Sequence, residues 1–96
     1  MVLTADHGGA AGEDRHDEAD EVETYRIPFV VWGRGIRPAD LYDLNPDYAD
    51  PGADQPAYDG PQPVRNGDLA NLATDLLGLG PVPGSELGAS QDLDWR

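Results

Sequence analysis

The sequence predicts a partial α/β domain in which the elements follow the order strand, loop, strand, long loop and helix. Three observations lead to this prediction. Residues 29–32 form a continuous apolar run, typical of a strand covered on both faces. Apolar residues recur at helical spacing between positions 66 and 78. Two short strands and one helix cannot enclose a core of their own, so we expect the C-terminal part of a larger α/β domain.

The length and composition limit the chain to one small domain. It has 96 residues, of which 12 are Gly and 9 are Pro, and it contains no Cys. Such a composition favours long connecting loops. We expect residues 1–84 to belong to the domain and residues 85–96 to form a tail. No apolar stretch approaches the roughly 20 residues that span a bilayer, and these features assign no compartment.

The chain is strongly acidic. It carries a net charge of −13, with 19 acidic residues against six basic ones, and all six are Arg. A charge of this sign argues against binding to nucleic acid or to anionic membranes, which require basic patches. An acidic field attracts cations, which is one interpretation of this charge. The other is an ordinary solvated surface, and we favour this second interpretation.

The first strand is expected over residues 1–5, and it leads directly to Asp6 and His7. Residues 8–24 are polar and acidic, which predicts a loop with a helical turn near 18–22. The second strand is expected over residues 25–32, which are rich in aromatic and β-branched side chains. Pro28 has no N–H to donate, so it belongs at the start or the edge of that strand.

The region after the second strand is predicted to be a long loop followed by a helix. Residues 33–65 are rich in turn-forming Gly, Pro, Asp and Asn, and we expect their tyrosines to pack the loop against the domain. Asn66 can cap a helix over 66–78, and Gly78 can end it. The apolar face of this helix consists of Leu69, Leu72, Ala73, Leu76 and Leu77.

The candidate metal ligands are Asp6, His7 and His16. A carboxylate combined with imidazoles suits Zn²⁺, Mn²⁺ or Fe. Neighbouring residues of a strand point to opposite faces, so Asp6 and His7 can reach one ion only if the backbone turns. Residues 8–9 are both Gly and permit that turn through a positive φ. The carboxylates that could orient the two imidazoles are those of Glu13, Asp14, Asp17 and Glu18.

Spacing alone does not assign a metal site, but the complete ordered string is more specific. It consists of Thr4-Ala5-Asp6-His7-Gly8-Gly9, then His16, then the segment YRIPFVVWGRGI at 25–36, then NGDLA at 66–70 and LLGLGP at 76–81. This order resembles the C-terminal part of the alkaline phosphatase superfamily, and in particular its sulfatase-like and phosphodiesterase/nucleotide-pyrophosphatase-like members. The resemblance covers residues 1–84. Arg34 stands where many relatives have Pro.

The resemblance implies an alkaline-phosphatase-like sandwich fold and a site with two divalent ions, with zinc first and manganese as an alternative. By this resemblance, Asp6 and His7 are ligands of the ion that also holds the nucleophile, and His16 is a ligand of the second ion. A two-ion site needs six or more protein ligands, so the remaining ligands and the nucleophile are expected outside these residues. The implied reaction is in-line attack on a phosphate or sulfate ester, and the chain is expected to be inactive alone.

Two other interpretations remain open at this point. The chain can be a small acidic interaction module without catalysis, or a lone regulatory metal-binding domain. Three ligands are too few for two ions, which argues for weak metal binding by the isolated chain. The sequence does not choose among phosphomonoester, phosphodiester, sulfate and phosphonate substrates, because the nucleophile and its pocket determine that choice.

Overall fold

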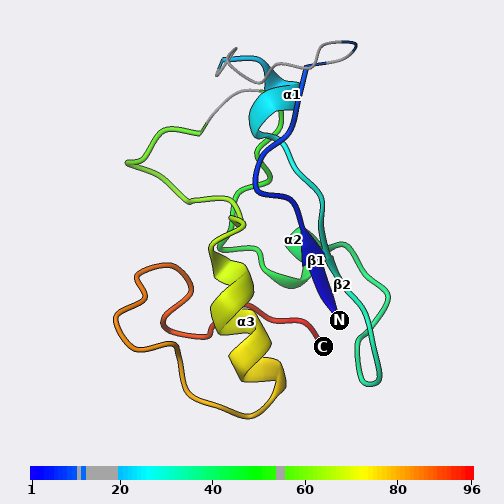
Figure 1. The fold of residues 1–96 in the computed structure, drawn as a ribbon, viewed down its shortest axis with the longest axis vertical. Coiled ribbons are helices and arrows are strands. Elements are labelled where there is room, and N and C mark those ends of the chain that lie inside the picture. Colours follow the sequence, from blue (N-terminus) through cyan, green and yellow to red (C-terminus); the bar gives the residue numbers. More distant parts are fainter. Residues whose placement is uncertain (11, 13–19, 54–55) are drawn as a thin grey trace.

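Two short segments that are distant in the sequence pair as an antiparallel sheet. The computed structural model describes residues 1–10, 12, 20–53 and 56–96. Strand β1 (Val2–Thr4) lies beside β2 (Phe29–Val31), with Leu3 opposite Val30 (Figure 1). Together with three short helices and long loops, this two-stranded sheet makes up a small mixed fold in the described residues. The mixture of strands and helices agrees with the expected fold class at this coarse level.

Strand β2 is shorter than the predicted strand over residues 25–32. Its ladder begins at Phe29, directly after Pro28, which has no N–H to contribute. The Thr4 hydroxyl instead donates to the carbonyl oxygen of Pro28 at 2.8 Å, so this Thr has a structural contact at the end of the sheet. Before Pro28 the chain forms helix α1 (Val22–Tyr25), which begins at the last residue of the turn expected near 18–22. Residues 18–19 of that expected turn lie outside the described residues.

Helix α3 (Asp68–Leu76) lies within the predicted range 66–78 and packs against β1. Its end is the expected one. Gly78 adopts a φ of +69°, and the Leu79 N–H donates to the carbonyl of Thr74 at 2.9 Å. This 6→1 bond, with the bond from Gly78 N–H to the Asp75 carbonyl, completes a Schellman motif. A glycine therefore stops the helix by the mechanism that the sequence indicates.

The face that α3 buries differs from the predicted apolar stripe. Leu72 is buried, but the Leu77 side chain is 73% exposed, so its assignment to the core is wrong. Leu77 is the C-cap of the helix, where the chain already turns away. Asn71 is 1% exposed, and its amide contacts Ser85, the Leu87 carbonyl and the Val82 N–H. A polar side chain therefore organises much of the buried side of this helix.

Helix α2 (Leu41–Leu44) interrupts the long segment that the sequence predicts as a loop. The Asp40 carboxylate accepts a hydrogen bond from the Tyr42 N–H at 2.8 Å, which caps this single turn. An Asp two positions before such an N–H is a recognisable signal, but the surrounding turn residues mask it. None of the helices in the described part of the chain has the length and apolar character that a membrane crossing requires.

The C-terminal residues lie against the rest of the chain, although they contain no helix or strand. Leu93 is 7% exposed, which makes it one of the few buried apolar side chains among the described residues. The Asn45 amide donates to the carbonyl of Asp94 at 2.8 Å and accepts from its N–H at 2.6 Å. The Trp95 indole donates to Asp75 in α3 at 2.8 Å. The segment expected as a tail is therefore fastened at several points.

One face of the sheet is open in the described residues. Leu3 and Val30 are each 48% exposed and Trp32 is 68% exposed, although the sequence predicts a strand covered on both faces. The reason is that α3 packs on the opposite face and no described segment covers this one. The chain exposes 6766 Å² in total, whereas a compact monomer of this mass exposes about 5,400 Å². The covering that the apolar run predicts is therefore missing from these residues.

The C-terminal attachment gives a testable dependence on alkaline pH. The Tyr48 hydroxyl donates to Asp92 at 2.9 Å, and burial, together with this carboxylate, raises the pKa of Tyr48 to about 12. An unfolded Tyr has a pKa near 10. The neutral phenol therefore stabilises the fold fully below about pH 10, and this contribution disappears as the pH rises to about 12.

We expect the wild-type chain to lose stability relative to Tyr48→Phe over that interval, because the variant has no phenol to ionise. Urea unfolding midpoints measured from pH 9 to pH 12 check this expectation. Parallel pH profiles for the two proteins would contradict it.

Candidate metal centre

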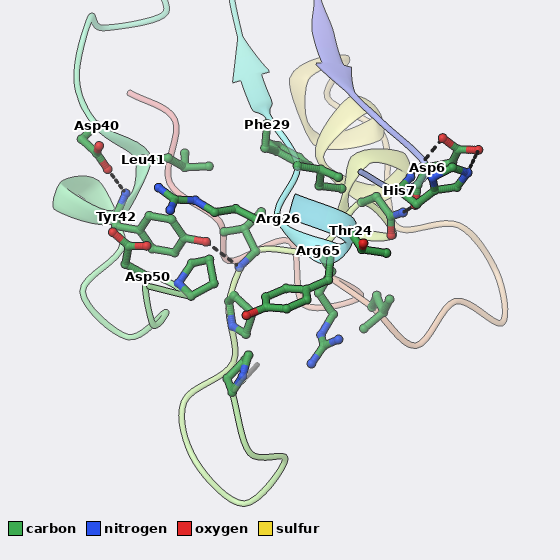
Figure 2. A pocket seen from close by; sticks show the side chains of 18 of the residues that line it. Asp6, His7, Thr24, Arg26, Phe29, Asp40, Leu41, Tyr42, Asp50 and Arg65 are labelled. Atoms are coloured by element: carbon green, nitrogen blue, oxygen red, sulfur yellow. Dashed lines mark hydrogen bonds and ion pairs between the residues drawn. The ribbon is translucent and has the colours of Figure 1, made fainter. Parts of the chain in front are cut away.

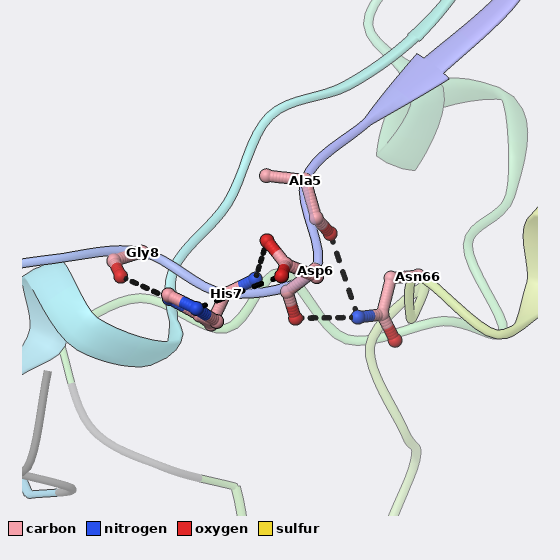
Figure 3. Close-up of polar contacts among 5 residues, drawn as sticks. All are labelled: Ala5, Asp6, His7, Gly8 and Asn66. Carbon is pink, nitrogen blue, oxygen red and sulfur yellow. Dashed lines mark hydrogen bonds and ion pairs between the residues drawn. The ribbon is translucent and has the colours of Figure 1, made fainter.

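Asp6 and His7 lie just beyond the end of β1, where the backbone has left the extended conformation. The His7 N–H donates to Asp6 Oδ1 at 3.0 Å, which orients the carboxylate towards the neighbouring imidazole (Figure 3). His7 Nε2 lies 3.6 Å from Asp6 Oδ2. The structure therefore brings together the two side chains that strand geometry alone would have separated.

A second contact indicates which nitrogen of the His7 imidazole carries the proton. His7 Nδ1 lies 2.6 Å from the carbonyl oxygen of Gly8. A carbonyl oxygen only accepts, so we assign the proton to Nδ1. In the neutral ring this leaves the lone pair on Nε2, the nitrogen that faces Asp6. Orientation of an imidazole by a backbone carbonyl is common at metal sites.

The separation of these two donor atoms suits a small divalent ion. Zinc binds imidazole nitrogen and carboxylate oxygen at about 2.0–2.2 Å with tetrahedral angles, which places two such ligands about 3.4 Å apart. The observed separation of 3.6 Å is close to that value. The side chains are 46% exposed for His7 and 89% exposed for Asp6, so an ion between them would remain open to further ligands.

The remaining predicted ligands are not among the residues that the structure describes. His16 lies outside them, as do Glu13, Asp14, Asp17 and Glu18, and these assignments stay predictions. Within residues 1–10, 12, 20–53 and 56–96, no group of three or more His, Asp or Glu side chains is arranged to hold a metal. The described part of the site thus supplies a pair of donors.

Gly8 positions this pair in a way that differs from the expected one. Neither Gly8 nor Gly9 has a positive φ, so the turn does not rely on a left-handed glycine. Gly8 is instead required for close packing, because a Cβ at this position would lie 1.9 Å from the carbonyl oxygen of Glu23 in α1. The Gly8 N–H donates to the Thr24 carbonyl at 2.8 Å. Contact with α1 therefore fixes the chain directly after His7.

Asn66 fixes the chain on the other side of the pair. Its side-chain amide donates to the carbonyl oxygen of Asp6 at 2.7 Å and lies 3.4 Å from that of Ala5 (Figure 3). The sequence predicts Asn66 as the cap of α3, but Gly67 is the residue at the N-cap and no side chain caps there. The cap assignment is therefore wrong, and the reason is that the amide has a partner 60 positions away.

A cavity of about 640 Å³ adjoins Asp6 and His7 (Figure 2). This volume is within the range of about 300–1,000 Å³ that is usual for small-molecule sites. The Thr24 hydroxyl in its wall is buried without a hydrogen-bond partner in the described residues. Burial raises the pKa of Tyr42, which also lines the cavity. The charged side chains in the lining are those of Asp6, Arg26, Asp40, Asp50 and Arg65.

Comparison with known proteins gives no family assignment. No protein-family profile, no curated protein and no solved structure matches this chain. The resemblance to the alkaline phosphatase superfamily therefore depends on the residues of the sequence, and what it implies about function belongs to a proposal.

The close approach of Gly8 to α1 predicts a large difference between two neighbouring glycines. A methyl group at Gly8 would collide with backbone, whereas a Cβ at Gly9 has no atom within 4 Å. We expect Gly8→Ala to destabilise the chain by about 1–3 kcal/mol, as overpacking does, and Gly9→Ala to change its stability little.

Urea denaturation of the two variants gives the comparison. We also expect Gly8→Ala to shift the NMR signals of Asp6 and His7, because the backbone must move away from Glu23. Equal stabilities for the two variants would show that the contact with α1 does not constrain the turn.

Proposed function

We propose that Asp6 and His7 bind a divalent cation in a metal-dependent hydrolase of phosphate or sulfate esters. The observation that carries this proposal is the 3.6 Å separation between His7 Nε2 and Asp6 Oδ2 at the end of β1. The ordered motifs that resemble the alkaline phosphatase superfamily suggest the reaction class. The sandwich fold of that superfamily is the larger architecture that we propose around these elements.

The described residues have distinct tasks in this proposed site. The Asp6 carboxylate contributes negative charge, and His7 contributes the lone pair of Nε2. The contact with the Gly8 carbonyl places the proton on Nδ1, so Nε2 is the nitrogen that would bind the cation. A bound divalent cation supplies Lewis-acid stabilisation to the oxygens of an ester. Because the chain has a net charge of −13, a cation would also reduce its repulsion of an anionic substrate.

The proposed site requires further groups beyond this pair. His16 is the ligand that we propose for a second ion, while the nucleophile and the other ligands come from polypeptide outside these 96 residues. Zinc is the metal that we propose, with manganese as the alternative, because both accept a mixed set of nitrogen and oxygen ligands. In this proposal, the isolated chain binds metal weakly and has no hydrolytic activity.

The open face of the sheet supports the view that these residues are part of a larger domain. Leu3, Val30 and Trp32 lie on one face and are about half exposed or more. Full burial of an apolar side chain is worth about 1.5–3 kcal/mol relative to full exposure. These side chains are already partly buried, so a further layer of structure would add a part of that stabilisation.

A second candidate function is an acidic interaction module without catalysis. The same open apolar face favours it, because a partner protein can cover Leu3, Val30 and Trp32. The two candidates differ in how the purified chain behaves without partners. A cooperative thermal transition that added Zn²⁺ does not shift favours the module, whereas a transition that Zn²⁺ moves to higher temperature favours the hydrolase fragment.

Zinc titration of the chain tests the proposed ligands directly. We expect the Nε2 resonance of His7 to shift on addition of Zn²⁺, and Asp6→Asn to weaken this response by about tenfold or more, because one of two donors is lost. Asp59→Asn is the matched control, since it removes the same charge from an exposed side chain that is not part of the cavity lining. Equal zinc affinities for the two variants would reject Asp6 as a ligand.

Hydrolysis is tested in a longer polypeptide that contains this chain and cleaves a phosphate or sulfate ester. We expect Asp6→Ala and His7→Ala each to reduce the metal-dependent activity to the background rate, because each removes a ligand from the ion. Activity measured with added Zn²⁺ or Mn²⁺ and with a chelator gives the comparison. Wild-type activity in either variant would reject the proposed function.

A further inference from the structure

We propose that Asn66 is a positioning residue that holds the backbone turn on which Asp6 and His7 lie. This inference rests on the proposed function, because it assigns a task at the proposed metal site. The Asn66 side-chain amide donates to the Asp6 carbonyl oxygen at 2.7 Å, and Figure 3 shows it reaching the turn from the side opposite Gly8. It contacts the backbone of the pair and neither of the two donor side chains.

The amide of Asn66 is presented from a firmly fixed part of the chain. The backbone carbonyl of Asn66 accepts a hydrogen bond from the Leu69 N–H at 3.2 Å, in the first turn of α3. The Asp68 carboxylate accepts from the Arg65 N–H at 2.7 Å, while the Asp68 N–H donates to the Arg65 carbonyl at 3.0 Å. These two bonds join Arg65 to Asp68 and so constrain the backbone of Asn66, which lies between them. Helix α3 also packs against β1. The Asn66 amide and the end of β1 therefore belong to elements that contact each other.

The turn is therefore held at both ends through its backbone. Asn66 holds the carbonyl of Asp6, and the Thr24 carbonyl in α1 holds the N–H of Gly8. Both bonds act on backbone atoms of the turn, so they hold it without occupying the Asp6 carboxylate or the His7 imidazole. Adjacent residues leave a strand towards opposite faces, so a restraint of this kind is needed to keep Nε2 and Oδ2 close together.

The isosteric variant Asn66→Asp tests this assignment, because an ionised carboxylate has the same shape but cannot donate a hydrogen bond. Ala70→Glu is the control. It adds the same charge at an exposed position of α3, one helical turn beyond Asn66. Asn66→Ala removes the donor without adding charge, and it keeps the test decisive if the aspartate variant is poorly folded.

The first measurement is amide hydrogen exchange, which does not depend on metal. We expect exchange at the Gly8 amide to become about fivefold faster in both Asn66 variants, as the loss of one hydrogen bond implies, with no change at the Leu72 amide in α3. Unchanged exchange at Gly8 overturns the inference. Equal acceleration at Gly8 and Leu72 also overturns it, because a general loss of stability would then explain the result.

The second measurement is the zinc affinity of His7, followed by NMR. The added charge of Asn66→Asp alone would attract a cation and tighten binding, as in Ala70→Glu, whereas a loosened turn weakens it. We expect about fivefold weaker binding in Asn66→Asp, and unchanged or tighter binding overturns the positioning role. If the wild-type chain shows no response at His7, the proposed function and the metal-positioning role both fail, and hydrogen exchange alone decides whether Asn66 holds the turn.

Discussion

The scarcity of buried apolar surface is the constraint on which the described structure depends. Leu72 and Leu93 are the buried apolar side chains of the described residues. Segments that are distant in the sequence are joined instead by the side-chain amides of Asn45, Asn66 and Asn71. The amides of Asn45 and Asn71 are buried. A buried amide costs free energy unless it is paired, so their contacts specify one arrangement of the chain. Directional hydrogen bonds, more than buried apolar area, determine where the loops lie.

The candidate metal centre follows the same principle. Its two donor side chains are exposed, and the structure around them acts through backbone carbonyls and N–H groups. The Gly8 carbonyl selects the imidazole tautomer, the Thr24 carbonyl holds the chain after His7, and Asn66 holds the chain before it. In a site built in this way, contacts from neighbouring elements to the backbone set the positions of the two ligands.

Local signals in the sequence predict the ends of elements well, because the responsible residues act on their own neighbours. Pro28 limits β2 and Gly78 ends α3 through backbone properties that need no distant partner. The role of Asn66 is different, since its amide pairs with a carbonyl 60 positions away, and a cap at the start of a helix is the natural local interpretation. The single turn of α2 is too short to produce a periodic pattern.

The candidate site could be predicted only in part for the same reason. The sequence identifies Asp6 and His7 and the need for a bend after the strand. It attributes the bend to glycine φ freedom, whereas the structure requires Gly8 because α1 lies too close for a Cβ. That proximity depends on residues 15 positions further along, and no spacing rule reports it. His16 lies outside the described residues, so its assignment stays a prediction.

The two-stranded sheet has a consequence for how copies of this chain behave together in solution. In the described residues β1 and β2 pair only with each other, so each strand keeps an outer edge whose N–H and carbonyl groups can receive a strand from another molecule. The charge of −13 opposes such self-association, but its range falls from about 30 Å at 0.01 M salt to about 3 Å at 1 M. Higher ionic strength therefore weakens the repulsion that keeps these strand edges of neighbouring molecules apart.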